Sequence, residues 1–234
     1  MARIDFPDPL EHEGPRWLTD GEFYYPAKGI VHLGGELSIE NLRNAYRKGI
    51  FPWYTPGLPL PWHSPDPRAI LVFDEVKIPR SLAKLRRQGK FTFTIDHDFR
   101  SVIAACAASE RPDQPGTWIT DEFIEVYSEL HKAGDAHSVE AWNKDGELVG
   151  GLYGVDAGGV FCGESMFYKE ANASKLALLF LIDHLRLRGS TWLDVQVMTP
   201  HLETLGAREI ARDVFLAKLR SAQQASNRLF SDVK

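Results

Sequence analysis

The spacing between hydrophobic positions changes several times along the chain, and each change marks the start of a new helix or strand. Residues 68–76 (RAILVFDEV) and 91–95 (FTFTI) are rich in β-branched and aromatic residues, which favour strands. Over 98–109 the apolar residues recur at helical spacing and share one face. The pattern predicts two strands and a following helix, with a short basic helix over 81–88 between the strands.

The second half of the chain is richer in strands. Asp145 and Gly146 supply the turn of a hairpin, and Asn172 is positioned to cap a very apolar helix. The expected elements, in order, are strands 137–142, 147–155 and 160–167, a helix from 172 to about 188, and a strand over 191–198. This order resembles the core of the acetyltransferase-type (GNAT-like) α+β fold, an analogy that fixes no function.

The N-terminal part contains one clear helix, and Thr120 is expected to begin another further along. Ser38 can cap a helix that runs to about Lys48. Residues 56–67 (PGLPLPWHSPDP) hold five prolines, which disfavour helix and central strand alike. We therefore place a domain boundary there, and expect a small α+β domain over 1–67 and a larger GNAT-like domain over 68–234.

Composition narrows the possible classes of protein. With a net charge of −5, the chain lacks the excess of basic residues that is typical of a nucleic-acid binder, so any RNA contact must be local. The two cysteines form no paired framework, the N-terminus has no signal-like apolar core, and the longest apolar run, 176–182, is too short to span a bilayer. We expect a cytoplasmic protein without membrane contact. We also expect a monomer, because the expected elements leave no long apolar stretch that would need a partner subunit to cover it.

Two carboxylates occur inside apolar strands, at Glu164 and Asp194. Strand alternation predicts Asp194 and Gln196 on one face. A buried carboxylate needs partners, so two interpretations stay open: structural hydrogen bonds, or a polar cluster at a crevice of the sheet.

Other candidate residues have plain alternatives as well. Trp53, Trp62 and Trp118 in loop-like settings could stack on bases or pack between domains, and the basic stretch 84–90 could contact phosphate or form a solvated helix face. No histidine spacing predicts a metal site, and GESMF lacks the pattern of a nucleophile elbow. A Cys162 nucleophile stays open by spacing, although a thiol in an apolar strand is more often an inert packed one.

Several motifs occur in one order over residues 30–216. They are FPWY (51–54), WHSPDPR (62–68), TWIT (117–120), HSVE (137–140), LVGGLYGV (148–155), FCGESMF (161–167), NASK (172–175), DVQV (194–197) and LGAREI (205–210). Together they resemble the signature blocks of the leucyl/phenylalanyl-tRNA–protein transferases. The resemblance implies an enzyme without metal or cofactor. Its donor would be leucyl- or phenylalanyl-tRNA, and its acceptor a protein beginning with Arg or Lys, which the transfer marks for degradation by the N-degron route.

The resemblance also implies roles for individual residues. Gln196 and Asp194 match the catalytic pair, with Asp194 expected to hold the Gln196 amide, and Glu164 matches the carboxylate that meets the substrates. The other implied contacts are Trp53 and Trp118 on the terminal adenosine, Leu152, Leu178, Leu181 and Leu185 in the pocket for the donor side chain, and Arg80, Lys84, Arg86 and Arg87 facing the tRNA stem.

Departures from the family pattern occur at His63, where a second Trp is frequent, and at Val195 and Thr199 around the expected catalytic strand. Leu181 and Leu185 stand where aromatic residues are common in the donor pocket. Two rival functions remain. An acyl-CoA-dependent N-acetyltransferase is disfavoured because the turn over 168–174 contains no glycine to cradle a pyrophosphate. The other is a non-catalytic module that binds tRNA or an N-degron.

Overall fold

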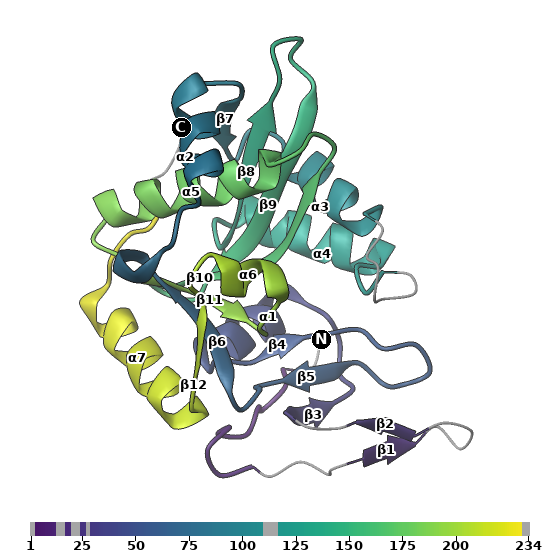
Figure 1. The fold of residues 1–234 in the computed structure, drawn as a ribbon. Helices are drawn as coiled ribbons and strands as arrows, with labels where there is room; N and C mark the ends of the chain where they lie inside the picture. The colour runs from purple at the N-terminus through teal and green to yellow at the C-terminus, as the bar shows by residue number, and fades with distance from the viewer. Residues whose placement is uncertain (1–2, 13–16, 20–23, 27–28, 110–116, 231–234) are drawn as a thin grey trace.

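The strands that the structure describes form three sheets (Figure 1). The computed structural model describes residues 3–12, 17–19, 24–26, 29–109 and 117–230. A two-stranded ribbon joins β1 (Trp17–Thr19) and β2 (Tyr24–Pro26), and a second sheet has the order β3 (Ile30–Leu33), β5 (Pro61–His63), β4 (Phe51–Pro52). Beside this small N-terminal sheet stands a seven-stranded mixed sheet with helices. The chain is therefore an α+β protein.

The Pro-rich segment contains a central strand, contrary to our expectation for 56–67. β5 lies between β3 and β4. Pro61 is its first residue, where a missing N–H is tolerated, and its carbonyl accepts a hydrogen bond from the Trp53 N–H at 3.0 Å. Trp62 is fully buried and donates to the Gly34 carbonyl at 2.9 Å, so it packs within the protein.

The large sheet is antiparallel except for one central pair. Its strands, in spatial order, are β12 (Arg208–Ile210), β6 (Arg68–Val72), β11 (Trp192–Gln196), β10 (Phe161–Tyr168), β9 (Leu148–Asp156), β8 (Ala136–Trp142) and β7 (Thr92–Ile95). β10 and β11 run parallel. Parallel neighbours need a crossover, and the helix α5 (Ala173–Leu187) makes it.

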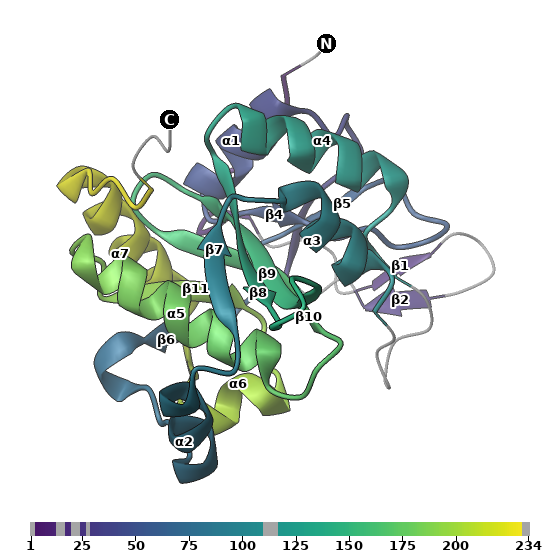
Figure 2. The same ribbon diagram turned by 90° about the horizontal axis from the view of Figure 1, so that it is seen from above.

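Helices cover both faces of this sheet (Figure 2). A Cβ on Gly150 would meet Ala173 of α5 at 2.5 Å, whereas one on Gly151 would come within 3.4 Å of Val102 on α3. Successive strand residues thus approach helices on opposite faces, at a distance that leaves Gly150 no room for a side chain. The other helices are α1 (Ile39–Arg47), α2 (Arg80–Gln88), α3 (Phe99–Ala107), α4 (Asp121–Lys132), α6 (Pro200–Thr204) and α7 (Arg212–Ala225), with a 3-10 turn over Phe73–Glu75.

Local capping predictions had mixed outcomes. Ser38 and Thr120 cap α1 and α4 through their side chains, as predicted. Asn172 is the N-cap residue of α5, as predicted, but its backbone is left-handed (φ 68°) and its side chain makes no capping hydrogen bond. The strand expected over 191–198 ends at Gln196, and α6 follows where no helix was expected.

One hydrophobic core runs across the Pro-rich segment. It combines Leu42 and Trp62 from the N-terminal part with Val102, Tyr153 and Phe215 from the rest. Within the described residues, no helix is both long and apolar enough to cross a bilayer.

Candidate functional site

A cavity of about 430 Å³ lies where the two parallel strands separate. β10 and β11 are in register at one pair, Cys162 with Asp194. Residues 163–166 and 195–197, which follow that pair on the two strands, line the cavity. The remaining wall is formed by Phe51, Pro52, Trp53, Trp118, Leu152, Tyr153, Phe161, Leu178, Leu181, Leu193, Thr199, His201 and Leu202.

Each of these strands carries an irregularity at the cavity. In β10 the pairing with β9 shifts between Gly163 and Ser165, which makes Glu164 the extra residue. In β11 the pairing with β6 shifts between Asp194 and Gln196, and Gln196 has a φ of 63°. Bulges bend a strand and re-aim its side chains, and a positive φ is uncommon for residues other than glycine. Alternation therefore fails here: Gln196 lines the cavity, and Asp194 is absent from its wall.

Glu164 and Gln196 meet across the gap between the strands. The Gln196 Nε2 donates to Glu164 Oε1 at 2.6 Å. The second carboxylate oxygen, Oε2, is buried and accepts no hydrogen bond from any described residue. Burial raises the pKa of Glu164 to about 7, while the Tyr46 hydroxyl and the Gln196 amide act in the opposite direction. A carboxyl with this pKa changes its charge near neutral pH.

Two buried tyrosines extend this polar group into the protein interior, and the sequence analysis missed both. The hydroxyls of Tyr46 and Tyr127 lie 2.7 Å apart. Burial raises the pKa of each well above its usual range, and the charge of Glu164 adds to the effect. Both hydroxyls therefore keep their protons at neutral pH and can donate. Tyr46 comes from α1, so the N-terminal part contributes directly to the environment of Glu164.

Asp194 is held by Arg68, another residue that the sequence analysis did not single out for a role. The Arg68 Nε and Nη2 donate to the two carboxylate oxygens at 2.9 and 2.6 Å, and both side chains are buried. The guanidinium also donates to the Gly49 carbonyl. Asp194 accepts from the backbone N–H of Gln196 at 2.9 Å. Asp194 thus does hold an amide of Gln196, but it is the main-chain amide, while the side-chain amide reaches Glu164.

The two expected tryptophans lie at the same cavity. Trp53 follows β4 and Trp118 precedes α4, and both line the wall. Trp118 is buried, with its ring edge-on to Phe123 at 5.6 Å. The structure therefore brings aromatic surfaces from two distant segments to one opening.

Three of the four expected leucines form part of an apolar wall. Leu152, Leu178 and Leu181 line the cavity, whereas Leu185 is fully buried and is not among the lining residues. Phe161, Met166 and Leu193 add apolar surface that the sequence analysis did not assign to a pocket.

The positions that depart from the family pattern also lie at or near the site. Thr199 caps α6 through its hydroxyl and lines the cavity, and Val195 lines it as well. His63 stacks on Phe51 with ring centroids 5.9 Å apart, and its Nε2 is buried without a partner among the described residues. Burial, assisted by the charge of Arg68, lowers the pKa of His63 to about 4.

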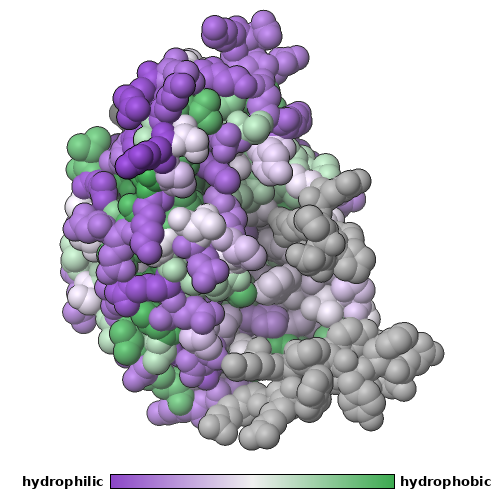
Figure 3. All heavy atoms as spheres, in the orientation of Figure 1, coloured by the Kyte–Doolittle hydropathy of each residue, from purple (hydrophilic) through white to green (hydrophobic). Residues whose placement is uncertain are grey.

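The basic helix α2 is exposed along its charged face, in a mostly hydrophilic part of the surface (Figure 3). Arg86 pairs with Asp183 of α5. In the described part of the chain, no carboxylate lies within ion-pair distance of Arg80, Lys84 or Arg87. Three cations of this helix are therefore available to an anionic partner.

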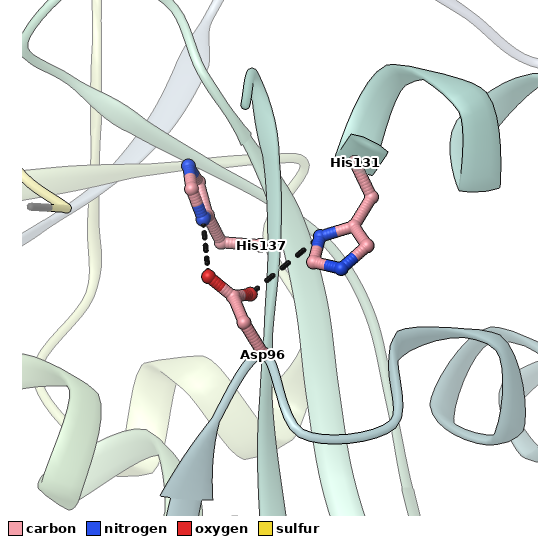
Figure 4. A group of neighbouring side chains, drawn as sticks. All are labelled: Asp96, His131 and His137. Atoms are coloured by element: carbon pink, nitrogen blue, oxygen red, sulfur yellow. Dashed lines mark hydrogen bonds and ion pairs between the residues drawn. The ribbon is translucent and has the colours of Figure 1, made fainter. Parts of the chain in front are cut away.

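One group of side chains has the composition of a metal site, at Asp96, His131 and His137 (Figure 4). Its ligand atoms lie within 4.8 Å of one another, but hydrogen bonds within the protein already occupy them. The His137 Nδ1 faces Asp96 Oδ2 at 2.7 Å, and the His131 Nδ1 faces the Ala136 carbonyl at 2.8 Å. A carbonyl can only accept, so the His131 Nδ1 carries a proton and has no lone pair for a metal. We therefore interpret the three side chains as a structural hydrogen-bonded cluster that connects the end of β7 with α4 and β8.

Comparison with known proteins identifies the family of the chain. Family models of the leucyl/phenylalanyl-tRNA protein transferase match residues 70–220, and of its N-terminal domain residues 35–66. A leucyl/phenylalanyl-tRNA–protein transferase of Chromohalobacter salexigens is 51% identical over 86% of this chain and 80% of its own. One from Syntrophus aciditrophicus is 52% identical over 83% and 81%, and one from Shewanella sp. is 50% identical over 90% and 88%. A solved structure of L-PGS from Bacillus licheniformis covers 64% of this chain and 48% of its own at 14% identity, with a TM-score of 0.38.

An α+β protein with a polar pair and an aromatic-rimmed cavity at its sheet has the features of a group-transfer enzyme. The chain belongs to the leucyl/phenylalanyl-tRNA–protein transferase family, and is an aminoacyltransferase of that kind.

Proposed function

We propose that this protein moves Leu, Phe or Met from a charged tRNA to the N-terminal Arg or Lys of acceptor proteins, creating an N-degron in the cytoplasm. The observation that carries the proposal is the single cavity wall that joins Trp53 and Trp118, the apolar leucines and the Glu164–Gln196 pair. A charged tRNA ends in the same three chemical parts: a base, an amino-acid side chain and a reactive ester.

The reaction is the aminolysis of that ester. The neutral acceptor α-amine attacks the ester carbonyl and the new C–N bond forms. The bond to the terminal ribose oxygen then breaks, and that oxygen takes up the proton that the amine loses. An α-amine has a pKa of about 7.7–8.0, so a useful fraction is neutral near pH 7. Holding the two reactants in attack geometry can supply roughly 7–11 kcal/mol, so position matters more than a strong base.

Each polar residue then has a distinct role. The Gln196 Nε2 is engaged by Glu164, which leaves the carbonyl oxygen of the Gln196 side chain to orient the amine. Glu164 in its ionised form attracts the cationic acceptor through its buried Oε2, which accepts no hydrogen bond from any residue that the structure describes. Asp194 does not line the cavity, and acts as a positioning residue that fixes the backbone of Gln196.

The apolar wall selects the donor. Leu152, Leu178 and Leu181 are buried, and burying an apolar side chain among them is worth about 1.5–3 kcal/mol. An apolar pocket discriminates weakly between side chains of similar size. Use of more than one donor is therefore part of the proposal.

The basic helix binds the tRNA stem in this proposal. Arg80, Lys84 and Arg87 contact backbone phosphates, with Arg86 beside them in its pair with Asp183. Few contacts are involved, and the net charge of −5 opposes a wider electrostatic footprint. Binding should therefore depend only moderately on salt.

We propose a GNAT-like fold for residues 68–234 and a small N-terminal domain over 1–67. Support comes from the antiparallel β8–β9–β10 run, the α5 crossover and the parallel strands that pair at one residue. The rival function, which uses acyl-CoA, is disfavoured because the turn from Tyr168 to Ser174, which would face a pyrophosphate, contains no glycine.

One assay tests the function. Radiolabelled Leu-tRNA is incubated with the enzyme and with two versions of one protein, beginning with Arg and with Met. Label is expected at the N-terminus of the Arg version alone, without added cofactor. Binding of either substrate without transfer would instead favour a non-catalytic module, and a thermal shift with acetyl-CoA would favour the acetyltransferase.

A further inference from the structure

His201 presents a polar atom that the proposed reaction does not use. It lines the cavity from α6, beside Leu202. Its Nε2 is buried and has no hydrogen-bond partner among the residues that the structure describes. Leaving such an atom unpaired destabilises a protein, so a buried one in a cavity wall indicates a group that binds there.

Neighbouring polar groups are not its partners, because they are engaged elsewhere. Gln196 Nε2 and Glu164 Oε1 bond to each other. The Thr199 hydroxyl accepts from the Leu202 N–H at 3.3 Å. The open position at His201 is therefore separate from the pair that faces the ester and the amine.

A second basic group, Lys175, lies on α5, the helix that contributes Leu178 and Leu181 to the same cavity wall. Lys175 lies one turn before Leu178 on α5, and residues three apart share a helix face, so Lys175 lies beside the part of α5 that lines the cavity. Burial lowers the pKa of His201, and the charge of Lys175 lowers it further. No described carboxylate lies within ion-pair distance of Lys175. Two basic side chains on elements that line one cavity, for which the described residues supply no anionic partner, favour an anion.

We propose that His201 and Lys175 bind the 5′-phosphate of the terminal nucleotide of the donor. This inference rests on the proposed function, in which the tryptophans take the base, the leucines the amino-acid side chain, and Glu164 with Gln196 the reacting groups. The phosphate is the one anionic part of an aminoacyl nucleotide that this division leaves without a contact. A ribose hydroxyl would satisfy His201, but would leave Lys175 without a partner.

The test compares the binding of adenosine and of adenosine 5′-monophosphate by titration calorimetry. The unmodified enzyme should bind the monophosphate about tenfold more tightly or better, as a charge-assisted contact would give. His201→Leu and Lys175→Met should each remove most of that preference and leave the adenosine affinity unchanged. His201→Gln, which can still donate at the Nε2 position, should keep part of it. Lys132→Met, at the exposed end of α4, serves as the matched loss of charge and should change neither affinity.

Three results would overturn the inference: equal affinity of the unmodified enzyme for the two ligands, no binding of the monophosphate, or a loss in His201→Leu that is the same for both ligands. The last result would place the imidazole at the ribose or the base. The transfer assay with charged tRNA is independent of this titration, so failure of the phosphate contact and failure of the proposed function can be told apart.

Discussion

The Arg68 guanidinium and the Asp194 carboxylate form a two-point ion pair in which the side-chain exposures are 1% and 0%. The carboxylate oxygen that meets Nε also accepts the backbone N–H of Gln196. The charge of Asp194 is thus balanced by Arg68, and both of its oxygens accept hydrogen bonds within the protein. This leaves Asp194 unsuited to remove a proton from a substrate. Its effect on the reaction passes through the backbone of Gln196.

Replacing Arg68 by Met should leave the buried Asp194 carboxylate without its counter-charge. We expect the free energy of unfolding to fall by about 3–5 kcal/mol, measured by urea denaturation. The double variant Arg68→Met/Asp194→Leu should lose less than Arg68→Met alone, because neither charge then remains. Arg208→Met, which breaks an exposed pair with Glu75, is the control and should cost about 0–1 kcal/mol. Equal losses in the single and the double variant would contradict the argument.

Gln196→Ala should lower kcat by about 100-fold or more, as loss of a positioned hydrogen-bonding group does in other enzymes. Affinity for charged tRNA should stay nearly constant, because the base and the donor side chain bind other walls. Gln196→Gly separates the side chain from the backbone, since glycine adopts a φ of 63° without strain. Both variants are expected to be equally slow, and normal turnover in either one excludes a role for the side chain.

Ionisation of Glu164 should appear in the pH dependence of acceptor binding. Its pKa is raised to about 7, so the carboxylate is neutral below that pH and negative above it. The KM for an Arg-initiated peptide should therefore decrease as the pH rises through about 7, while the Arg side chain of the peptide stays cationic. Glu164→Gln should lack this inflection. An inflection that survives unchanged in the variant must come from another group, such as the peptide amine.

His63 should make the protein sensitive to acid. Its pKa is about 4 when folded and 6.5 in the unfolded chain, so between these values the unfolded chain binds the additional proton. The free energy of unfolding should then fall as the pH drops from 6.5 towards 4, by up to about 3 kcal/mol. His63→Gln should remove this part of the dependence, and His97→Gln, at an exposed ring, should not. Identical pH profiles for the protein and His63→Gln would show that other groups cause the acid sensitivity.

Local signals in the sequence predicted much of the fold. The turn at Asp145–Gly146 and the caps at Ser38 and Thr120 depend on a few adjacent residues, and the corresponding hairpin and helices are present. Asn172 marked the start of α5 correctly, but the expected side-chain bond is missing, because asparagine suits both a capping bond and the left-handed backbone that it adopts here. The short strands around residues 30–63 lack a clear alternating pattern, and their pairing is set by contacts with each other.

The partners within the site were harder to predict, because they come from distant parts of the chain. Arg68 and Asp194 are 126 residues apart, and Tyr46 and Tyr127 are 81 apart. No spacing rule joins such pairs. The bulges at Glu164 and Gln196 shift side chains between faces, which strict alternation cannot anticipate.

The guanidinium of Arg68 lies 4.8 Å from the centre of the Phe51 ring and 4.5 Å from that of Phe215, and it bonds to the Gly49 carbonyl. A residue at the start of the large sheet is thereby enclosed by an N-terminal strand and the last helix. A replacement of the segment that carries Phe51 must therefore preserve this contact with the cation. The N-terminal part and the remainder of the chain are consequently coupled through one buried cation.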